Sequence, residues 1–453
     1  MKKKWIAFCL VLVMLLTACG TEEDSVRRGK QREAKSKNSS GTNTVTPTAT
    51  PTVEPTKEPE ESRTIRMWSN AIKSSTERYA YDKAAQEMRE LYPDVILDWT
   101  ATESEAYKTK LASAAAANSG VLPDFYLSWS AANLRDLVES GRAYNLNGVY
   151  EKHRQQLPEH MCKNMTVDGI MYGIPIGYSA IHLYFNLDLL KSVGYTLVPN
   201  TFEELLICCD KLRAVGVYPF GCASYGNETW CISEYFETIL LKICGEQELD
   251  RLFLGKKTWE NEDVIKAAEL LQTLVRGEYI DPNCANMSNE EVCRRFINGE
   301  YAFYINGSWQ SPNIAANMSD PAIGDFPVID PARASAGTCI GGPNVSFVVS
   351  PFAEDPEFVA EYAFELARRI AKYEYLSEAY LPAWKIDYDD SQVNALSVQA
   401  AHDALEKGGM VLYGDNMISS YQDIRNYFLS LYHLCALNYD PETFAAALKS
   451  AIR

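Results

Sequence analysis

Short apolar segments alternate with helical patterns from Arg63 onward, and this alternation constrains the fold more than any other feature of the chain. The expected strands are residues 64–68, 95–99 and 124–127. The expected helices between them are residues 76–91, opened by a Ser/Thr cap, and 103–118, closed by Gly120. Strands separated by helices pair in parallel, and ligands then lie at the carboxyl ends of the strands. The sequence therefore predicts an α/β fold.

The rest of the chain is mostly helical and is too long for a single core. Further helices are expected at residues 201–215 (with Thr201 and Glu204 as a capping box), 232–244, 261–276 and 289–298, and further strands at 302–305 and 345–350. The last hundred residues are expected to be helical apart from a loop at 381–391. About 390 residues follow the N-terminal region, so two domains are expected.

The N-terminus carries an export signal. Three lysines precede an apolar run at residues 5–16, which is too short to span a bilayer stably. The run ends in Leu16-Thr17-Ala18-Cys19, which resembles the bacterial lipobox and implies cleavage after residue 18 and acylation of Cys19. We expect the mature protein on the outer face of the membrane of a Gram-positive-type bacterium. A plain secretory signal with a chance cysteine is the alternative.

A Thr/Pro/Glu-rich stretch follows the signal. Residues 19–62 contain almost no large apolar side chains, so they cannot bury enough surface to fold, and we expect a disordered tether. A random coil of this length spans about 35 to 40 Å. The tether would lift the folded body clear of the membrane.

Charge and cysteine content exclude several classes of protein. The net charge is -17, and loss of the signal's lysines makes it about -20, without a basic stripe. We therefore expect no nucleic acid partner and membrane contact only through lipid. Ten cysteines beyond Cys19 are too few for a disulfide scaffold and are expected to be small buried apolar residues. A disulfide bond between Cys222 and Cys231, or between Cys284 and Cys293, is the alternative.

Five segments of the chain carry a resemblance when taken together: residues 117–147, 167–194, 199–221, 296–314 and 341–366. In their order and spacing they resemble family 1 of the extracellular solute-binding proteins, which feed ABC sugar importers and are typified by maltodextrin binders. The resemblance implies a type II periplasmic-binding-protein-like fold with two α/β lobes, a hinge and a ligand cleft, acting as a monomer without a cofactor and delivering its ligand to permease subunits. The first lobe is expected at residues 63–175 plus about 338–372, and the second at 176–337 plus about 373–453.

A site for sugar needs aromatic plates for its apolar C–H faces and hydrogen-bonding groups for its hydroxyls. Trp68 and Asn70 follow the first expected strand, and Ser128 and Trp129 follow the third, so we expect all four to line the cleft. Tyr178 lies on the apparent crossing between the lobes, where a hinge-packing role is its alternative.

The second lobe supplies the remaining candidates. Trp230 opens a helix in a polar setting, and Trp309 follows a Gly-rich turn where the family often places a stacking tryptophan. Gly341 and Gly342 would let the backbone approach a ligand, with Asn344 or Ser346 in place of the carboxylate that many relatives carry there. For Trp384 in the loop, ligand contact and packing on a helix are equally open. Trp99 and Trp259 are expected to be structural.

Enzymatic and metal-binding classes find no support in the sequence. Residues 177–181 lack the second glycine of a nucleophile elbow, and a pair of carboxylates can always be imagined among 60 acidic residues. The five histidines form no i,i+4 pair, and residues 387–390 lack the glycine of a calcium loop. The sequence therefore predicts a lipid-anchored receptor that passes a carbohydrate, an oligosaccharide, to an ABC permease. A receptor for another solute and a surface adhesin without a transporter are the alternatives.

Overall fold

The computed structural model describes residues 62–452 except 74, 76, 118–119, 130, 227, 386–388, 408 and 419. The predicted signal at residues 1–18, the predicted lipidation site Cys19 and all but the last residue of the predicted tether lie outside this part of the chain. No helix in the described part is both long and apolar enough to cross a membrane.

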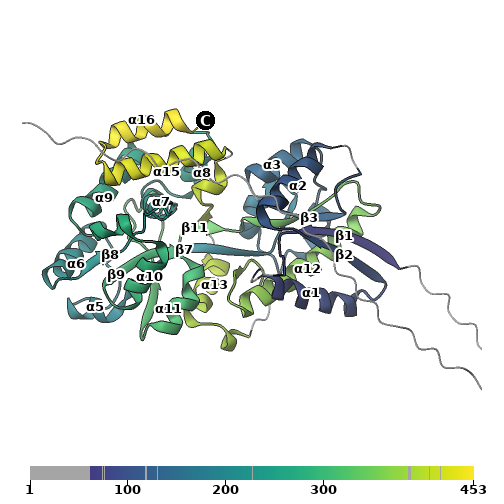
Figure 1. The fold of residues 1–453 in the computed structure, drawn as a ribbon, viewed down its shortest axis with the longest axis horizontal. Helices are drawn as coiled ribbons and strands as arrows, with labels where there is room; N and C mark the ends of the chain where they lie inside the picture. The colour runs from purple at the N-terminus through teal and green to yellow at the C-terminus, as the bar shows by residue number, and fades with distance from the viewer. Residues whose placement is uncertain are drawn as a thin grey trace, which may run out of the picture. The chain divides into compact units, whose positions relative to one another are not determined.

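The first sheet has five strands in the order β2-β1-β3-β12-β6. They are β1 (Arg63–Ser69), β2 (Val95–Ala101), β3 (Phe125–Trp129), β6 (Gly173–Pro175) and β12 (Val345–Val349). Figure 1 labels β1, β2 and β3 of this sheet on the right of the view. Strand β1 runs parallel to β2 and β3, whereas β12 is antiparallel to β3 and β6. The first three predicted strands and their parallel pairing are confirmed.

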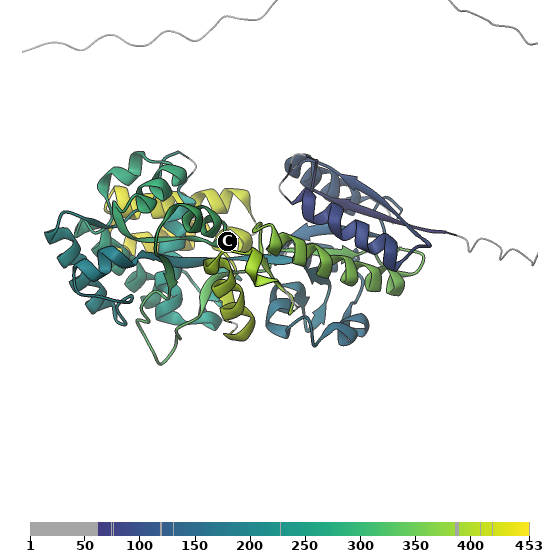
Figure 2. The same ribbon diagram turned by 90° about the horizontal axis from the view of Figure 1, so that it is seen from below.

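The helices of this first lobe bury apolar stripes against the sheet. They are α1 (Arg78–Leu91), α2 (Ser104–Ala116), α3 (Ala132–Glu139), α4 (Asn147–His153), the 3-10 helix η1 (Glu159–Met165) and α12 (Pro356–Leu376), with a small hairpin of β4 (Thr166–Val167) and β5 (Ile170–Met171). In α1, Ala80, Ala84 and Met88 recur every four residues and are fully buried. Figure 2 shows α12, in light green, beside α1, in dark blue, with which it is in contact.

The second sheet is built around the long strand β7 (Gly177–Asn186) in the order β14-β11-β7-β9-β8, and two short strands also pair with β7. The other strands are β8 (Tyr218–Phe220), β9 (Tyr301–Gly307), β10 (Pro321–Gly324), β11 (Cys339–Gly342), β13 (Leu381–Pro382) and β14 (Met410–Val411). Strand β9 is buried along its whole length and confirms the strand predicted at residues 302–305.

Helices surround this second sheet, and one of them is enclosed by the others. They are α5 (Leu187–Ser192), α6 (Phe202–Ala214), α7 (Trp230–Cys244), α8 (Glu246–Phe253), α9 (Glu262–Arg276), η2 (Pro282–Asn286), α10 (Asn289–Ile297), η3 (Ser308–Gln310), α11 (Ser311–Asn317), η4 (Asp390–Gln392), α13 (Ala395–Lys407), α14 (Gly414–Met417), α15 (Tyr421–Ala436) and α16 (Pro441–Ala451). The predicted cap of α6 is present, since Thr201 Oγ1 accepts from Glu204 N at 3.2 Å. Helix α7 is buried at every position after Trp230, packed by α8, α9 and α15.

The chain passes between the two sheets at three places: from β6 to β7, from β11 to β12 and from α12 to β13. The boundary expected near residue 338 places β11 in the first lobe. In the structure, β11 instead pairs with β7 and β14 and belongs to the second sheet. The crossing therefore falls after Gly342, between β11 and β12.

The cysteines behave as predicted from their low density. All ten cysteines in the described part of the chain are free, and eight of them are buried. The two bridges left open by the sequence are not formed there, because Cys222, Cys231, Cys284 and Cys293 are all free thiols.

Candidate functional site

Two predicted tryptophans lie at the carboxyl ends of neighbouring parallel strands, where α2 contacts both. Trp68 is the next-to-last residue of β1 and Trp129 is the last residue of β3, and both side chains are half-buried. The ammonium of Lys110 lies 3.7 Å from the centroid of the Trp68 ring. The ring of Tyr107 lies 6.0 Å from that of Trp129, and its hydroxyl donates to Leu127 O at 2.6 Å. The first sheet thus presents two aromatic rings at one edge.

The polar residues predicted beside these tryptophans differ in accessibility. Asn70 is half-buried, and its Nδ2 donates to Ser104 Oγ at 3.4 Å. Ser128 is 1% exposed, so its hydroxyl is covered in this structure. The neighbouring Ser69 hydroxyl accepts from Trp99 Nε1 at 2.9 Å, and Trp99 has the structural role expected of it.

Three aromatic rings from distant parts of the sequence meet in the second lobe. Trp230 begins α7, and its ring contacts that of Trp309 edge-on, with centroids 6.0 Å apart. The ring of Tyr413 lies 6.3 Å from Trp309 on another side. Trp309 is 40% exposed, so part of its ring is accessible to a ligand. The structure therefore brings together the two predicted tryptophans and adds Tyr413.

Gly307 explains how Trp309 reaches this position. A Cβ atom at residue 307 would lie 2.1 Å from Cζ3 of the Trp309 ring. Only glycine leaves room for the ring to fold back over the turn between β9 and η3.

A row of polar groups borders the aromatic cluster. The hydroxyls of Tyr413 and Ser179 share a hydrogen bond of 3.0 Å. Asn416 Oδ1 accepts from Asn344 Nδ2 at 3.5 Å, and Asn416 Nδ2 donates to Asp415 Oδ1 at 2.8 Å. Burial raises the pKa of Asp415. The predicted residue Asn344 is therefore joined to a carboxylate that the sequence analysis did not single out.

Buried carboxyl groups of α7 lie beneath this row. Glu237 accepts from Gly414 N at 3.1 Å and from the Tyr427 hydroxyl at 2.8 Å, so it fixes the turn that carries Tyr413. Burial raises the pKa of Glu237 to about 8. Glu234 is 3% exposed, and its Oε2 has no hydrogen-bond partner. Burial, and secondly the charge of Glu237, raise the pKa of Glu234 well above its usual range.

Two predicted aromatic residues belong to the core instead. Tyr178 and Trp384 are both 0% exposed. The Tyr178 hydroxyl donates to Ala400 O at 3.4 Å, and Trp384 Nε1 donates to Pro175 O at 2.9 Å. Both side chains pack around the crossings between the sheets, so in this structure they offer no ring face to a ligand.

Gly341 and Gly342 both have positive φ angles, and Gly341 allows close strand pairing. A Cβ at Gly341, whose φ is +142°, would lie 2.4 Å from Ser179 O. Gly342 has a φ of +119° and faces Asn164 and Met410, with a Cβ-to-Nδ2 distance of 3.4 Å to Asn164. Gly341 therefore lets β11 lie close against β7, whereas at Gly342 a Cβ would make only ordinary contacts and it is the positive φ that favours glycine.

A groove of about 820 Å³ is lined by both lobes. Ala132 and Arg135 of α3 line it on one side, and Met417, Ile418 and residues 253–259 on the other. Met417 closes α14, the helix that carries Asp415 and Asn416. The polar row thus lies next to an opening between the lobes.

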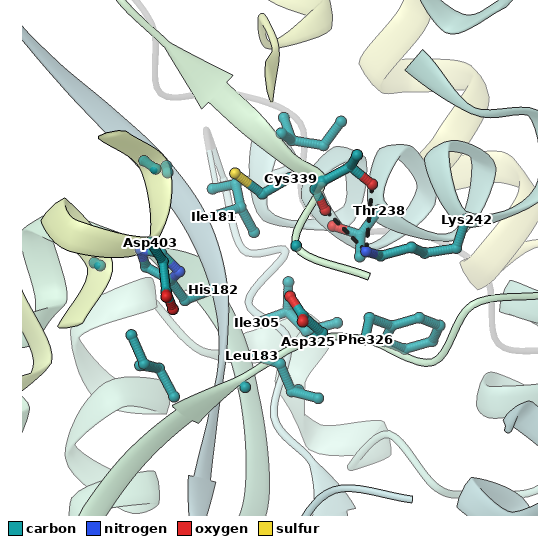
Figure 3. Close-up of a pocket in the computed structure, with 18 of the residues that line it drawn as sticks. Ile181, His182, Leu183, Thr238, Lys242, Ile305, Asp325, Phe326, Cys339 and Asp403 are labelled. Atoms are coloured by element: carbon teal, nitrogen blue, oxygen red, sulfur yellow. Dashed lines mark hydrogen bonds between the residues drawn. The ribbon is translucent and has the colours of Figure 1, made fainter. Parts of the chain in front are cut away.

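A separate cavity of about 190 Å³ lies against β7, α7 and α13 (Figure 3). The ammonium of the buried Lys242 donates to Thr338 O at 2.8 Å and to Ser335 O at 3.1 Å, which ties α7 to the segment before β11. His182 Nε2 has no hydrogen-bond partner, and burial lowers the pKa of His182 to about 4. None of the residues predicted to contact a ligand lines this cavity.

The arrangement at the lobe edges suits a ligand with apolar faces and many hydroxyls. Ring faces cover C–H surfaces, while carboxylates and amides exchange hydrogen bonds with hydroxyls. Within the described ranges, no group of three or more His, Cys, Asp or Glu residues is placed to hold a metal ion. Tyr413, Asp415 and Asn416 were missed, because they follow the short strand β14, which the sequence analysis did not predict.

Comparison with known proteins agrees with this architecture. A family model described as bacterial extracellular solute-binding protein matches residues 73–366. A multiple sugar-binding protein of Streptococcus mutans is 23% identical over 51% of this chain and 55% of its own length. The maltodextrin-binding protein MdxE of Bacillus subtilis is 23% identical over 57% of this chain and 61% of its own length. The chain thus spans about half the length of the curated relatives it matches.

Solved structures match a larger share of this chain than the curated relatives do. A protein studied for xylan utilization by Caldanaerobius polysaccharolyticus has a TM-score of 0.69 and 25% identity, covering 86% of this chain and 100% of its own. A family 1 solute-binding protein of Bifidobacterium longum subsp. infantis has a TM-score of 0.71 and 18% identity, covering 86% and 99%. The predicted two-lobed fold is confirmed. The chain belongs to the family of bacterial extracellular solute-binding proteins.

Proposed function

We propose that the protein is a lipid-anchored receptor that binds a carbohydrate, an oligosaccharide, between its two lobes and delivers it to the permease of an ABC transporter. The observation that carries the proposal is the cluster of Trp230, Trp309 and Tyr413 beside Asp415 and Asn416. It combines an exposed ring with hydroxyl-binding groups, which is the chemistry that a sugar requires. Relatives named for sugar and maltodextrin binding support the same class of ligand.

Closure of the lobes would couple binding to delivery. A ligand that contacts Trp68 and Trp129 from one lobe and Trp230 and Trp309 from the other binds the closed state more tightly than the open one. The first lobe would comprise residues 63–175 and about 343–372, and the three crossings would form the hinge. The permease would recognise the closed form.

The anchor at Cys19 would keep a monomeric receptor beside its transporter on the outer face of the membrane. Tethering raises the local concentration of the receptor at the permease. Metabolic labelling with a fatty acid tests this part, since the protein should incorporate label and Cys19→Ser should not. Incorporation of label into both the unaltered protein and the Cys19→Ser variant would contradict acylation at Cys19.

A thermal-shift screen tests the ligand class. The probes are monosaccharides, the xylo-, chito-, manno- and malto-oligosaccharide series, amino acids, polyamines and metal salts. A ligand at one hundred times its Kd stabilises the fold by about 2.7 kcal/mol, so a specific sugar should raise the melting temperature clearly. A shift caused only by compounds other than sugars would contradict the proposal.

A further inference from the structure

A second aromatic surface lies beside Trp230, and the function proposed above does not use it. A groove of about 880 Å³ runs between the loop that precedes α7 and the exposed face of α15. Tyr225, Gly226 and Thr229 line it from the loop, and Tyr421 and Tyr432 line it from α15. We call it the outer groove.

The aromatic side chains of the outer groove are exposed to an extent that core packing does not explain. Tyr421 is 76% exposed, Tyr225 61% and Tyr432 37%. On α15, the groove residues Tyr421, Arg425 and Tyr432 recur at helical spacing and therefore share one face. They extend over about 16 Å of the helix axis, which is long relative to a single sugar ring. Gathered exposed rings of this kind mark a binding surface.

Polar groups interleave with these rings. Thr229 and Arg425 also line the outer groove, as do Gln422 and Asn426, whose side chains share a hydrogen bond of 3.0 Å. Hydroxyl, amide and guanidinium groups beside aromatic faces repeat the chemistry of the cleft. Ile424, Phe428 and Leu429 line the outer groove as well. Apolar and polar side chains therefore occur together there, which suits the C–H faces and the hydroxyls of a sugar chain.

A short turn joins the outer groove to the cleft. The backbone N–H of Glu228 donates to Tyr225 O at 3.0 Å, and its carboxylate accepts from Trp230 Nε1 at 3.0 Å. Glu228 therefore holds Tyr225 and Trp230 in one turn. The Trp230 ring in turn contacts Trp309, so Glu228 links a residue that lines the outer groove to the aromatic cluster of Trp230, Trp309 and Tyr413.

We propose that the outer groove extends the carbohydrate site and holds sugar units that emerge from the cleft past Trp230. The inference rests on the function proposed above and specifies its substrate as a glycan chain longer than the cleft. Its consequence is that affinity rises with chain length and that the rise depends on Tyr421 and Tyr225.

Calorimetric titration of the purified full-length protein tests this. The probes are the shortest binding member and the longest soluble member of the oligosaccharide series that gives the largest thermal shift. The long chain should bind about tenfold more tightly than the short one, and Tyr421→Ala should remove that difference, which equals about 1.4 kcal/mol. Tyr225→Ala should have the same effect. Tyr79→Ala is the matched control, because Tyr79 is an exposed tyrosine of α1 at 53% exposure.

Five outcomes would overturn the inference. Equal affinity of the parent for both chain lengths would show that the outer groove binds no sugar, as would unchanged long-chain affinity in both variants. An equal loss for short and long chains would show that the tyrosines act on the cleft itself. If the two tyrosine variants bind the long sugar normally but cells that carry them take up less of it, the outer groove would be a docking surface for the permease. If the parent binds no sugar at all, the proposed function fails as well.

Discussion

Trp309→Ala should weaken sugar binding while leaving the fold intact. Trp309 is 40% exposed, so of roughly 250 Å² that a tryptophan can bury, about 100 Å² is free for a ligand. At about 25 cal/mol per Å², covering all of it contributes about 2.5 kcal/mol, and covering one ring face contributes about half of that. The expected loss is therefore about 10- to 60-fold in Kd.

Calorimetric titration with the sugar from the thermal-shift screen measures this loss, and thermal unfolding without ligand checks the fold. Trp309→Phe is the matched control, since a smaller ring keeps part of the stacking surface and should lose less affinity. Trp230→Ala should weaken binding too, because its ring supports Trp309 at 6.0 Å. Unchanged Kd values in both alanine variants would refute the reasoning and place the site elsewhere.

Three further predictions concern the support of the site. Trp384→Ala should lower the free energy of unfolding by about 3 to 5 kcal/mol in urea titrations, because the ring is fully buried and bonded to Pro175 O; lost binding at unchanged stability would show that Trp384 is a ligand contact. Gly307→Ala should displace the Trp309 ring, since the new Cβ would meet it at 2.1 Å, and should weaken sugar binding; wild-type affinity would contradict this. Burial raises the pKa of Glu237 from its ordinary value of 4.5 to about 8, so the folded state retains a proton that the unfolded chain has lost. The free energy of unfolding should therefore fall as pH rises through that window, by at most about 1.4 kcal/mol per unit for this group, and Glu237→Gln should reduce the slope. An equal slope in both proteins would exclude Glu237 as a contributor.

The alternation of strand and helix patterns was sufficient to predict the three parallel strands β1, β2 and β3 of the first sheet, but neither β6 nor the antiparallel pairing of β12. Local periodicity specified β1, α1 and β2 because each buries an apolar pattern of its own. Strand β11 was assigned to the wrong lobe. Its last residues, Gly341 and Gly342, precede a proline and have no hydrophobic periodicity that would show which sheet the strand joins. Its place is fixed by the close approach of Gly341 to β7, a contact between residues far apart in the sequence.

The candidate site residues were less predictable than the fold. Trp309 was singled out because a Gly-rich turn marks its position, and Gly307 leaves the room that its ring needs. Tyr178 and Trp384 looked equally suitable in sequence, but burial depends on tertiary packing and covers both rings. Tyr413 was missed because it joins the site through Ser179, more than two hundred residues away.

Calorimetric titration of the unaltered protein with the sugar of largest thermal shift tests the central claim most directly. The account predicts saturable binding of one sugar molecule per chain. It also predicts a negative heat-capacity change from apolar burial when the titration is repeated at several temperatures. Saturable binding of an amino acid or polyamine, with none of any sugar, would contradict it.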